Sequence, residues 1–309
     1  MRTFTNPVDR VRAAIIRRPV DHTPCGEIVI DDALVRSFVG RNDVGFAERV
    51  EFVRSFGLDL VCLAALVSGD GGGNRLPSAH QVTWPDLDRW VRQTDRFVFV
   101  MLDGLMGWGF KLLGWEKFLL AAMKRTNEFE ELALAIEALN LALIERAAEE
   151  GAMGVLIADD IAYQRGLMMS PTVLRERFFP SLARQVNRAR WAKLPTFFHS
   201  DGDIREVVDD VVEAGFDGLQ GVESAAGMDI GELRRQCGHR LCLWGNLCPS
   251  VLLSPPSVAD LEPAVAGVVG STRGQGGLIF GTSSGLVEGM DLESLRLVYE
   301  LARTLSASA

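Results

Sequence analysis

Residues 155–160 read VLIADD and residues 196–203 read TFFHSDGD, so two apolar runs each end in polar, ionisable side chains. Short, almost continuously apolar runs are typical of parallel strands that are covered on both faces. Between them, Ser170 followed by Pro171 indicates the beginning of a helix, because serine caps a helix and proline fits its first turn. The stretch from 155 to 203 therefore predicts a strand, a helix and a second strand.

The same alternation of apolar and amphipathic segments continues along the chain. Helices are predicted over residues 1–20, Glu116–Glu150, Arg205–Ala214 (ending before Gly215) and Asp291–Leu305. Eight strand–helix alternations predict an α/β fold, a (β/α)8 or TIM barrel whose bottom is closed by residues 1–20. A doubly wound open sheet is the alternative, although no Gly-rich dinucleotide fingerprint follows any strand. The eight predicted strands are Glu27–Ile30, Leu60–Leu63, Phe97–Leu102, Val155–Ala158, Thr196–His199, Gly218–Val222, Leu241–Trp244 and Leu278–Phe280.

The composition is that of a folded, acidic protein. The chain has 309 residues, 48% of them hydrophobic and 24% charged, and we expect one barrel domain over residues 1–309. The net charge of −9 argues against binding to nucleic acid or to anionic membranes, which both need a basic face. Five cysteines, an odd number, fit free thiols in a reducing compartment. The sequence shows neither an apolar signal segment nor an apolar run of about 18 residues, so we expect a cytoplasmic protein.

Polar side chains gather where the predicted strands end. In a barrel of this type the carboxyl ends of the strands form the working face, so residues distant in sequence meet there. Several carboxylates, one imidazole, one amide and a hydroxyl are therefore expected at a shared cavity. These candidate site residues are Glu27, Asp159, Asp160, His199, Asp201, Glu223, Asn246 and Ser284.

His199 and the adjacent aspartates each have a structural alternative. A histidine can act as base, acid or metal ligand near neutral pH, or it can be a buried side chain bonded to backbone carbonyls. We expect His199 to be functional because the fold places it at the barrel mouth. Of Asp159 and Asp160, we expect one to bond to backbone or to Arg165 and the other to face the pocket and hold a ligand.

Glu27 and Asn246 also have two interpretations. An unpaired buried carboxylate is costly, so Glu27 is expected to have a metal, a substrate or an arginine as its partner. Asn246 is expected to orient a substrate, or else to cap a loop.

Taken together, these motifs resemble the uroporphyrinogen decarboxylase superfamily, which includes zinc- and corrinoid-linked methyltransferases. The resemblance runs nearly from end to end and implies the same barrel fold. The segments that carry it are residues 9–24, Asp159-Asp160, residues 169–171, residues 179–180, residues 199–203, residues 214–218, Glu223, residues 226–229 and residues 245–247.

The departures from the family pattern bear on the substrate. True decarboxylases of the superfamily carry an Arg-Gln-Ala-Gly-Arg run after strand one, whereas residues 25–32 read CGEIVIDD here. An Asp after strand two is also missing from residues 63–67, and Ser283-Ser284-Gly285 replaces Gly-His-Gly near strand eight. A substrate with many carboxylates would meet acidic groups instead of guanidinium groups. Charge repulsion therefore argues against porphyrinogen decarboxylation.

The methyltransferase branch implies a metal site that is altered here. Its members bind zinc through His-x-Cys after strand five and a Cys after strand eight. His199 is present, but Asp201 replaces the first Cys and a serine replaces the second. The resemblance therefore implies a non-thiolate zinc site made of His199, Asp201 and Glu223, with Glu27 as a further candidate.

The resulting hypothesis is a methyltransferase that acts on a small methyl donor or acceptor, such as a methoxylated aromatic or a methylamine-type compound. A separate corrinoid protein is the expected partner, and the chain itself is expected to be a monomer or homodimer. The alternatives are a divergent decarboxylase or lyase that uses His199 as acid, and a non-catalytic ligand-binding barrel. The expected roles are catalytic for His199, Asp160 and Asn246, substrate-binding for Glu27, Asp159 and Ser284, and metal-binding for His199, Asp201 and Glu223.

Overall fold

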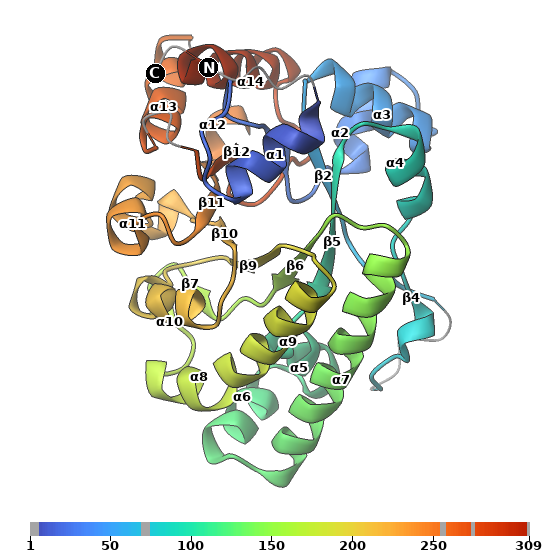
Figure 1. Ribbon diagram of the computed structural model, residues 1–309, viewed down its shortest axis with the longest axis vertical. Helices are drawn as coiled ribbons and strands as arrows, with labels where there is room; N and C mark the ends of the chain where they lie inside the picture. The colour runs from blue at the N-terminus through green and yellow to red at the C-terminus, as the bar shows by residue number, and fades with distance from the viewer. Residues whose placement is uncertain (1–5, 69–74, 254–257, 273–275, 308–309) are drawn as a thin grey trace.

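Eight parallel strands form the centre of the molecule (Figure 1). The computed structural model describes residues 6–68, 75–253, 258–272 and 276–307. Within them, single bridges join Cys25 to Phe280 and Ile30 to Leu286, so the last strand returns to the first. The (β/α)8 barrel is therefore confirmed, and the open-sheet alternative is wrong. In spatial order the strands are β1 (Gly26–Glu27), β2 (Leu60–Leu63), β5 (Phe97–Asp103), β6 (Gly154–Ala158), β9 (Thr196–Ser200), β10 (Gly218–Gly221), β11 (Cys242–Leu247) and β12 (Leu278–Thr282).

The strands are apolar on both sides because two separate hydrophobic clusters cover them. In β5, Phe97 and Phe99 belong to the cluster inside the barrel, while Val98 and Val100 belong to the cluster between the barrel and its helices. The inner cluster is aromatic at its centre, with ring centroids of Phe99 and Trp244 5.3 Å apart. On strands such as β5 this alternation is hidden in the sequence, because both faces take apolar side chains.

Helices surround the barrel, and two short hairpins leave the carboxyl ends of β2 and β6 (Figure 1). None of the described helices is both long enough and apolar enough to cross a membrane. The hairpins are β3 (Leu66–Val67) with β4 (Val82–Thr83), and β7 (Ala162–Tyr163) with β8 (Gly166–Leu167). The helices are α1 (Pro7–Ile15), α2 (Asp32–Val39), α3 (Phe46–Ser55), α4 (Leu87–Gln93), α5 (Leu105–Leu113), α6 (Trp115–Lys124), α7 (Asn127–Glu149), α8 (Pro171–Arg177), α9 (Phe179–Trp191), α10 (Val208–Glu213), α11 (Ile230–Cys237), α12 (Ser250–Leu253), α13 (Val258–Gly270) and α14 (Leu292–Ala307), with 3-10 turns at Ala79–Gln81, Arg205–Val207 and Ser224–Ala226.

Helix α1 closes the amino-terminal end of the barrel, as predicted, but it spans Pro7–Ile15 within the predicted range 1–20, of which residues 1–5 lie outside the described residues. Its buried residues Val11, Ala14 and Ile15 join the inner cluster, which also contains the first residues of β2 and β5. Arg10 on the same helix is buried and donates to Asp59 at 2.6 Å and to Asp21 at 2.9 Å. The opposite, carboxyl-terminal end of the barrel is therefore the one open to ligands.

Two predicted helices have different boundaries. The stretch Glu116–Glu150 is interrupted at Arg125, whose φ of +53° is left-handed. The Thr126 hydroxyl then accepts from the backbone N–H of Phe129 and begins α7, because an N-cap outcompetes continuation of the preceding helix. Residues 205–207 form a 3-10 turn before α10. The helix beginning at Pro171, capped by Ser170, is confirmed.

Candidate functional site

His199 lies at the end of β9, and its ring is held by one side chain. Nδ1 of His199 is hydrogen-bonded to Oε1 of Gln220, which is fully buried on the neighbouring strand β10. Nε2 of Gln220 donates to the carbonyl oxygen of Ser283 at 3.1 Å. Because that carbonyl can only accept, the amide of Gln220 must present its oxygen to the ring. Nδ1 therefore carries the proton in the neutral ring, and Nε2 keeps its lone pair for a proton or a metal ion.

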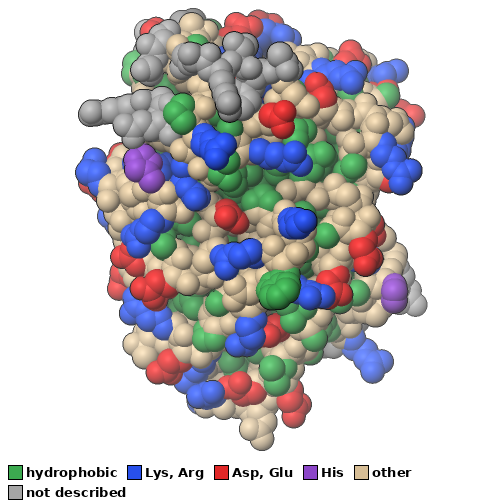
Figure 2. All heavy atoms as spheres, in the orientation of Figure 1, with side chains coloured by type: hydrophobic (Ala, Val, Ile, Leu, Met, Phe, Trp, Pro, Cys, Tyr) green, Lys and Arg blue, Asp and Glu red, His purple; other side chains and the backbone are tan. Residues whose placement is uncertain are grey.

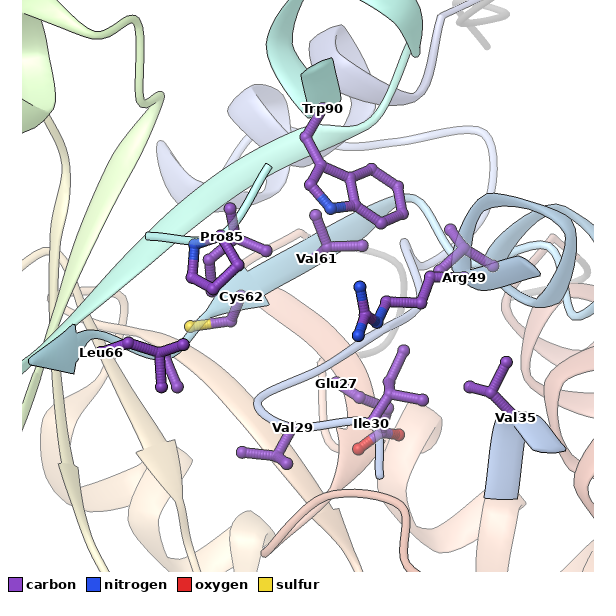
Figure 3. A pocket seen from close by; sticks show the side chains of 13 residues that line it. Glu27, Val29, Ile30, Val35, Arg49, Val61, Cys62, Leu66, Pro85 and Trp90 are labelled. Atoms are coloured by element: carbon purple, nitrogen blue, oxygen red, sulfur yellow. The ribbon is translucent and has the colours of Figure 1, made fainter. Parts of the chain in front are cut away.

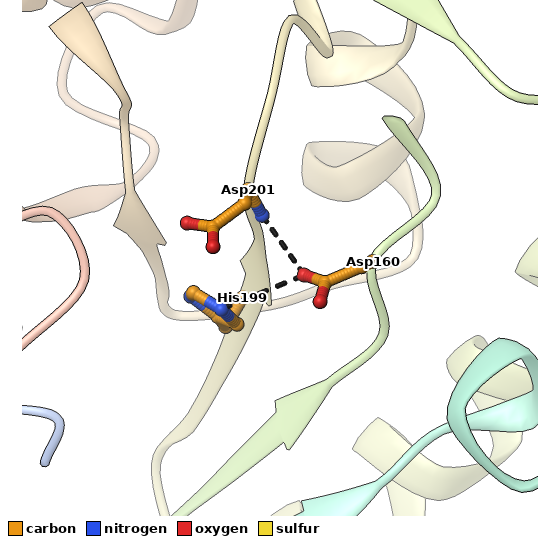
Figure 4. A group of neighbouring side chains, drawn as sticks. All are labelled: Asp160, His199 and Asp201. Atoms are coloured by element: carbon orange, nitrogen blue, oxygen red, sulfur yellow. Dashed lines mark hydrogen bonds and ion pairs between the residues drawn. The ribbon is translucent and has the colours of Figure 1, made fainter. Parts of the chain in front are cut away.

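Two carboxylates lie at the free edge of this imidazole (Figure 4). Nε2 of His199 is 3.6 Å from Oδ1 of Asp160, and the same oxygen accepts from the backbone N–H of Asp201 at 2.9 Å. One ligand atom from each of the three residues lies within 4.8 Å of the other two. The structure thus brings together three of the residues singled out in the sequence, from the ends of β6 and β9.

Asp201 carries an unsatisfied oxygen. Its Oδ1 is buried and has no hydrogen-bond partner among the described residues. Burial raises the pKa of Asp201, nearby His199 opposes that rise, and the negative charges of Asp160 and Glu223 add to it. A buried acceptor without a donor is rare in native structures and indicates a group that is satisfied by a ligand or an ion.

Glu223 lies beside this group but is not part of it. Its Oε2 accepts from the backbone N–H of Gly202 at 3.0 Å, so it holds the turn that follows β9. Gly202 has φ of +83°, and a Cβ there would lie 2.6 Å from the backbone of Tyr163. Only glycine fits this turn. The structure therefore groups Asp160, rather than Glu223, with His199 and Asp201.

A cavity of about 430 Å³ opens in front of His199 at the carboxyl ends of the strands. Ser284, predicted to bind substrate, is among the residues that line it. Among the described residues no Lys or Arg lines the cavity; the ammonium of Lys111 instead pairs with Asp103 at 2.7 Å. The ring of Trp115, half exposed, packs on Phe110 at the rim. The lining residues are Ile28, Val29, Met101, Asp103, Met106, Gly107, Phe110, Trp115, Ala158, Asp160, Met168, His199, Asp201 and Ser284.

Asp159 is directed away from this cavity into the beginning of α5. Its carboxylate accepts from the backbone N–H groups of Leu105, Met106 and Gly107 at 3.1, 2.6 and 3.2 Å. Burial raises the pKa of Asp159 to about 7, although these three donors oppose the rise. Its expected role in substrate binding is thereby corrected, because its oxygens cap a helix. Of the aspartate pair, only Asp160 faces the cavity.

Glu27 is fully buried at the seam of the barrel, where the last strand β12 meets the first strand β1. Its oxygens accept from the Tyr299 hydroxyl at 2.6 Å, the Thr282 hydroxyl at 2.6 Å and the Thr282 backbone N–H at 2.9 Å. No cation balances it in this arrangement, so burial raises the pKa of Glu27 to about 7. A metal, a substrate or an arginine was expected as its partner; among the described residues its partners are three neutral donors from Thr282 and Tyr299. Glu27 joins β1 to β12 and α14, and it does not line the His199 cavity.

The side-chain amide of Asn246 is also hydrogen-bonded to the backbone. Its Nδ2 donates to the carbonyl oxygens of Val222 and Met228 at 2.9 and 3.1 Å, and it lines a different cavity, beside α11 and α13. This is the loop-capping alternative, and it corrects the expectation that Asn246 orients a substrate beside His199. Gln220, by contrast, was missed. Its signal was a lone amide inside an otherwise apolar run, one strand along from His199.

Comparison with known proteins places the chain in a family. The sequence profile described as uroporphyrinogen decarboxylase matches residues 109–305. Uroporphyrinogen decarboxylase of Pelodictyon phaeoclathratiforme is 27% identical over 169 residues, which are 54% of this chain and 46% of that protein. The enzyme of the same name from Chlorobium luteolum is 28% identical over 162 residues, 52% of this chain and 44% of that protein. The matches thus span about half the length of these curated relatives.

Solved structures support the same fold. A methyltransferase from Methanosarcina mazei has a TM-score of 0.77 at 18% identity, covering 96% of this chain and 98% of that one. A 3-keto-D-glucoside 4-epimerase from E. coli has a TM-score of 0.51 at 13% identity, covering 91% and 98%. At these identities the likeness concerns the barrel alone. The profile match over most of the chain is the stronger finding, and by it the chain belongs to the uroporphyrinogen decarboxylase family.

Proposed function

We propose that the chain is a methyltransferase that moves a methyl group between a small methyl donor or acceptor and a separate corrinoid protein. The observation that carries the proposal is the cavity in front of His199. It offers an imidazole with a free Nε2 between two carboxylates, surrounded by apolar and thioether side chains. Such a site suits a small molecule that has one heteroatom and little negative charge.

The same cavity disfavours the reaction after which the family is named. A substrate with many carboxylates needs cationic partners, and no Lys or Arg lines the described cavity. Asp160 and Asp201 contribute negative charge instead, whereas the charge of Asp103 is paired with that of Lys111. Bringing an anion into a partly buried site beside like charges costs free energy in proportion to the lost solvation. A neutral or cationic methyl compound does not meet this penalty.

The three clustered residues fit a metal ion. Asp160, His199 and Asp201 supply one imidazole nitrogen and two carboxylate oxygens, a donor set that zinc accepts at catalytic sites with three protein ligands. The unsatisfied Oδ1 of Asp201 would gain a partner, and Gln220 already fixes the ring as the metal-binding tautomer. When bound, zinc supplies Lewis acidity toward a heteroatom of the substrate.

Side chains at the cavity can also assist the reaction directly. Where no metal occupies Nε2 of His199, that nitrogen can instead hold or deliver a proton at the heteroatom from which the methyl group leaves, which makes an unactivated C–O or C–N bond easier to break. Ser284 offers a hydroxyl to orient that atom. Met101, Met106 and Trp115 limit access of water and strengthen these electrostatic interactions. The corrinoid supplies the cobalt that carries the methyl group, and we propose that it belongs to the partner.

The test follows the visible spectrum of cob(I)alamin or methylcob(III)alamin mixed with the purified chain and candidate methyl donors or acceptors. We expect conversion of one form to the other with at least one compound. His199→Ala should slow it about 100-fold or more, the range typical of a lost acid–base group. His239→Ala, at an exposed turn, is the matched control and should leave the rate unchanged. Absence of a spectral change across the panel would overturn the proposal.

A decarboxylase remains the second candidate because the profile and the curated relatives carry that name. In that case His199 is the acid, and carbon dioxide is released from a small acid with no corrinoid present. A non-catalytic ligand-binding barrel predicts no metal in elemental analysis, no turnover, and the same ligand affinity in His199→Ala as in the natural chain. Release of carbon dioxide without a corrinoid, or no turnover at all, would therefore separate these two candidates from corrinoid methylation.

A further inference from the structure

A second cavity, of about 210 Å³, lies beside β1 and β2 and is covered by α2, α3 and α4 (Figure 3). Its wall is mostly aliphatic, with the indole of Trp90 on one side and Val29 and Ile30 opposite in this view. The lining residues are Glu27, Val29, Ile30, Val35, Arg49, Val53, Val61, Cys62, Leu63, Ala64, Leu66, Pro85 and Trp90. None of the roles described above uses it.

The two charged groups at its wall are already occupied. Arg49 donates through Nε and Nη2 to the two oxygens of Asp32, each at 2.8 Å, and its Nη1 is 3.7 Å from Asp86. The oxygens of Glu27 accept from three neutral donors on Thr282 and Tyr299. An anionic ligand would therefore find no free cation and would lie near a buried carboxyl group. The wall selects for an uncharged, apolar group.

The volume sets the size of that group. An apolar cavity of about 150 Å³ in another protein stays dry and binds benzene, because no polar partner holds water there. The additional space here corresponds to a ring with one small substituent. Trp90, buried and packed edge-on to Phe46 with centroids 5.1 Å apart, gives this wall a fixed aromatic surface.

Val29 is shared by the walls of the two cavities. It is 41% exposed and lines both this cavity and the one in front of His199. We propose that the second cavity binds the uncharged apolar body of the substrate, a group about the size of a substituted benzene ring, while its heteroatom end passes Val29 toward His199. The second half of this statement rests on the proposed function, whereas the first half is a binding property of the chain alone.

The test is a titration of the chain with toluene, an uncharged probe of the right size, and with benzoate, its anionic counterpart, followed by calorimetry. We expect toluene to bind and benzoate to bind about tenfold more weakly or worse, because ionised carboxylate must be desolvated. Ala64→Phe adds a ring at an exposed position of the wall and should weaken toluene binding about tenfold. Val67→Phe, exposed and outside the cavity, should not change it.

The link to the His199 cavity has its own readout. Benzyl alcohol carries a heteroatom end, so His199→Ala should weaken its binding while the affinity for toluene stays the same. Equal toluene affinity in Ala64→Phe and the natural chain, or benzoate binding as tight as toluene, would overturn the apolar site. If His199→Ala binds both benzyl alcohol and toluene as tightly as the natural chain does, the link is overturned. No corrinoid is present, so these results do not depend on whether methyl transfer occurs.

Discussion

At the scale of single residues, the site depends on how one imidazole is oriented. His199 could be predicted from its position after an apolar run, and so could the presence of aspartates beside it. The sequence could not show which aspartate faces the cavity, because Asp159 and Asp160 are adjacent and only the backbone direction separates them. It also could not show Gln220 as the partner of Nδ1, since strand pairing brings the two residues together.

Gln220→Leu tests that partnership. The variant keeps side-chain volume but removes the acceptor of the Nδ1 proton, so we expect the His199 ring to become a mixture of tautomers. Nitrogen-15 NMR of the imidazole should show one tautomer in the natural chain and averaged signals in the variant. Gln93→Leu, at an exposed helix end, is the control. A single unchanged tautomer in Gln220→Leu would show that the amide does not set the protonation of the ring.

At the scale of elements, the strands were more predictable than the helices. Each apolar run corresponds to a barrel strand, although β1 ends at Glu27 rather than Ile30 and β11 continues to Leu247. The long predicted helix failed at Arg125 because Thr126, a weak helix former and a favoured N-cap, begins a new helix there, a local signal that the periodicity of the apolar residues on both sides obscured. Glu27 was placed correctly at β1, but its partners come from β12 and α14, which no local pattern reveals.

Glu27 makes the seam between these elements sensitive to pH. Burial raises its pKa to about 7, so the folded chain binds a proton there more tightly than the unfolded chain does. This contribution to the free energy of unfolding is complete below about pH 4 and is lost as pH rises through about 7, by up to about 3 kcal/mol. Urea unfolding of the natural chain and of Glu27→Gln should show a difference that shrinks or reverses over this range. A difference independent of pH would contradict the raised pKa.

At the scale of the whole molecule, two hydrophobic clusters and a dispersed surface charge define the barrel. Basic and acidic side chains are interspersed on the face seen in Figure 2, so the net charge of −9 is not gathered there into one patch. The barrel itself could be predicted from eight alternations. Its closed amino-terminal end could be predicted from the first helix. The cavity in front of His199 and the cavity beside Trp90 could not be predicted, because each is formed by side chains from five or more elements.

Val11→Ala tests how much α1 contributes to the whole barrel. Val11 is fully buried in the inner cluster, and deleting its two methyl groups should lower the free energy of unfolding by about 2 kcal/mol. Denaturant unfolding followed by tryptophan fluorescence measures this loss. Arg12→Ala, on the exposed side of the same helix, should change it by less than about 0.5 kcal/mol. Equal effects of the two substitutions would mean that α1 is not part of the cooperative unit.

The aromatic centre of the inner cluster has a consequence for the order in which molecules bind and leave. Phe99, Phe197 and Trp244 are fully buried below the His199 cavity, so in the described part of the chain no passage runs through the barrel. A small molecule in the His199 cavity must therefore enter and leave through the same opening, at the carboxyl ends of the strands. If a corrinoid protein covers that opening, as proposed, the small molecule must bind before it and the product must leave after it, so steady-state kinetics should follow an ordered sequential pattern with a ternary complex.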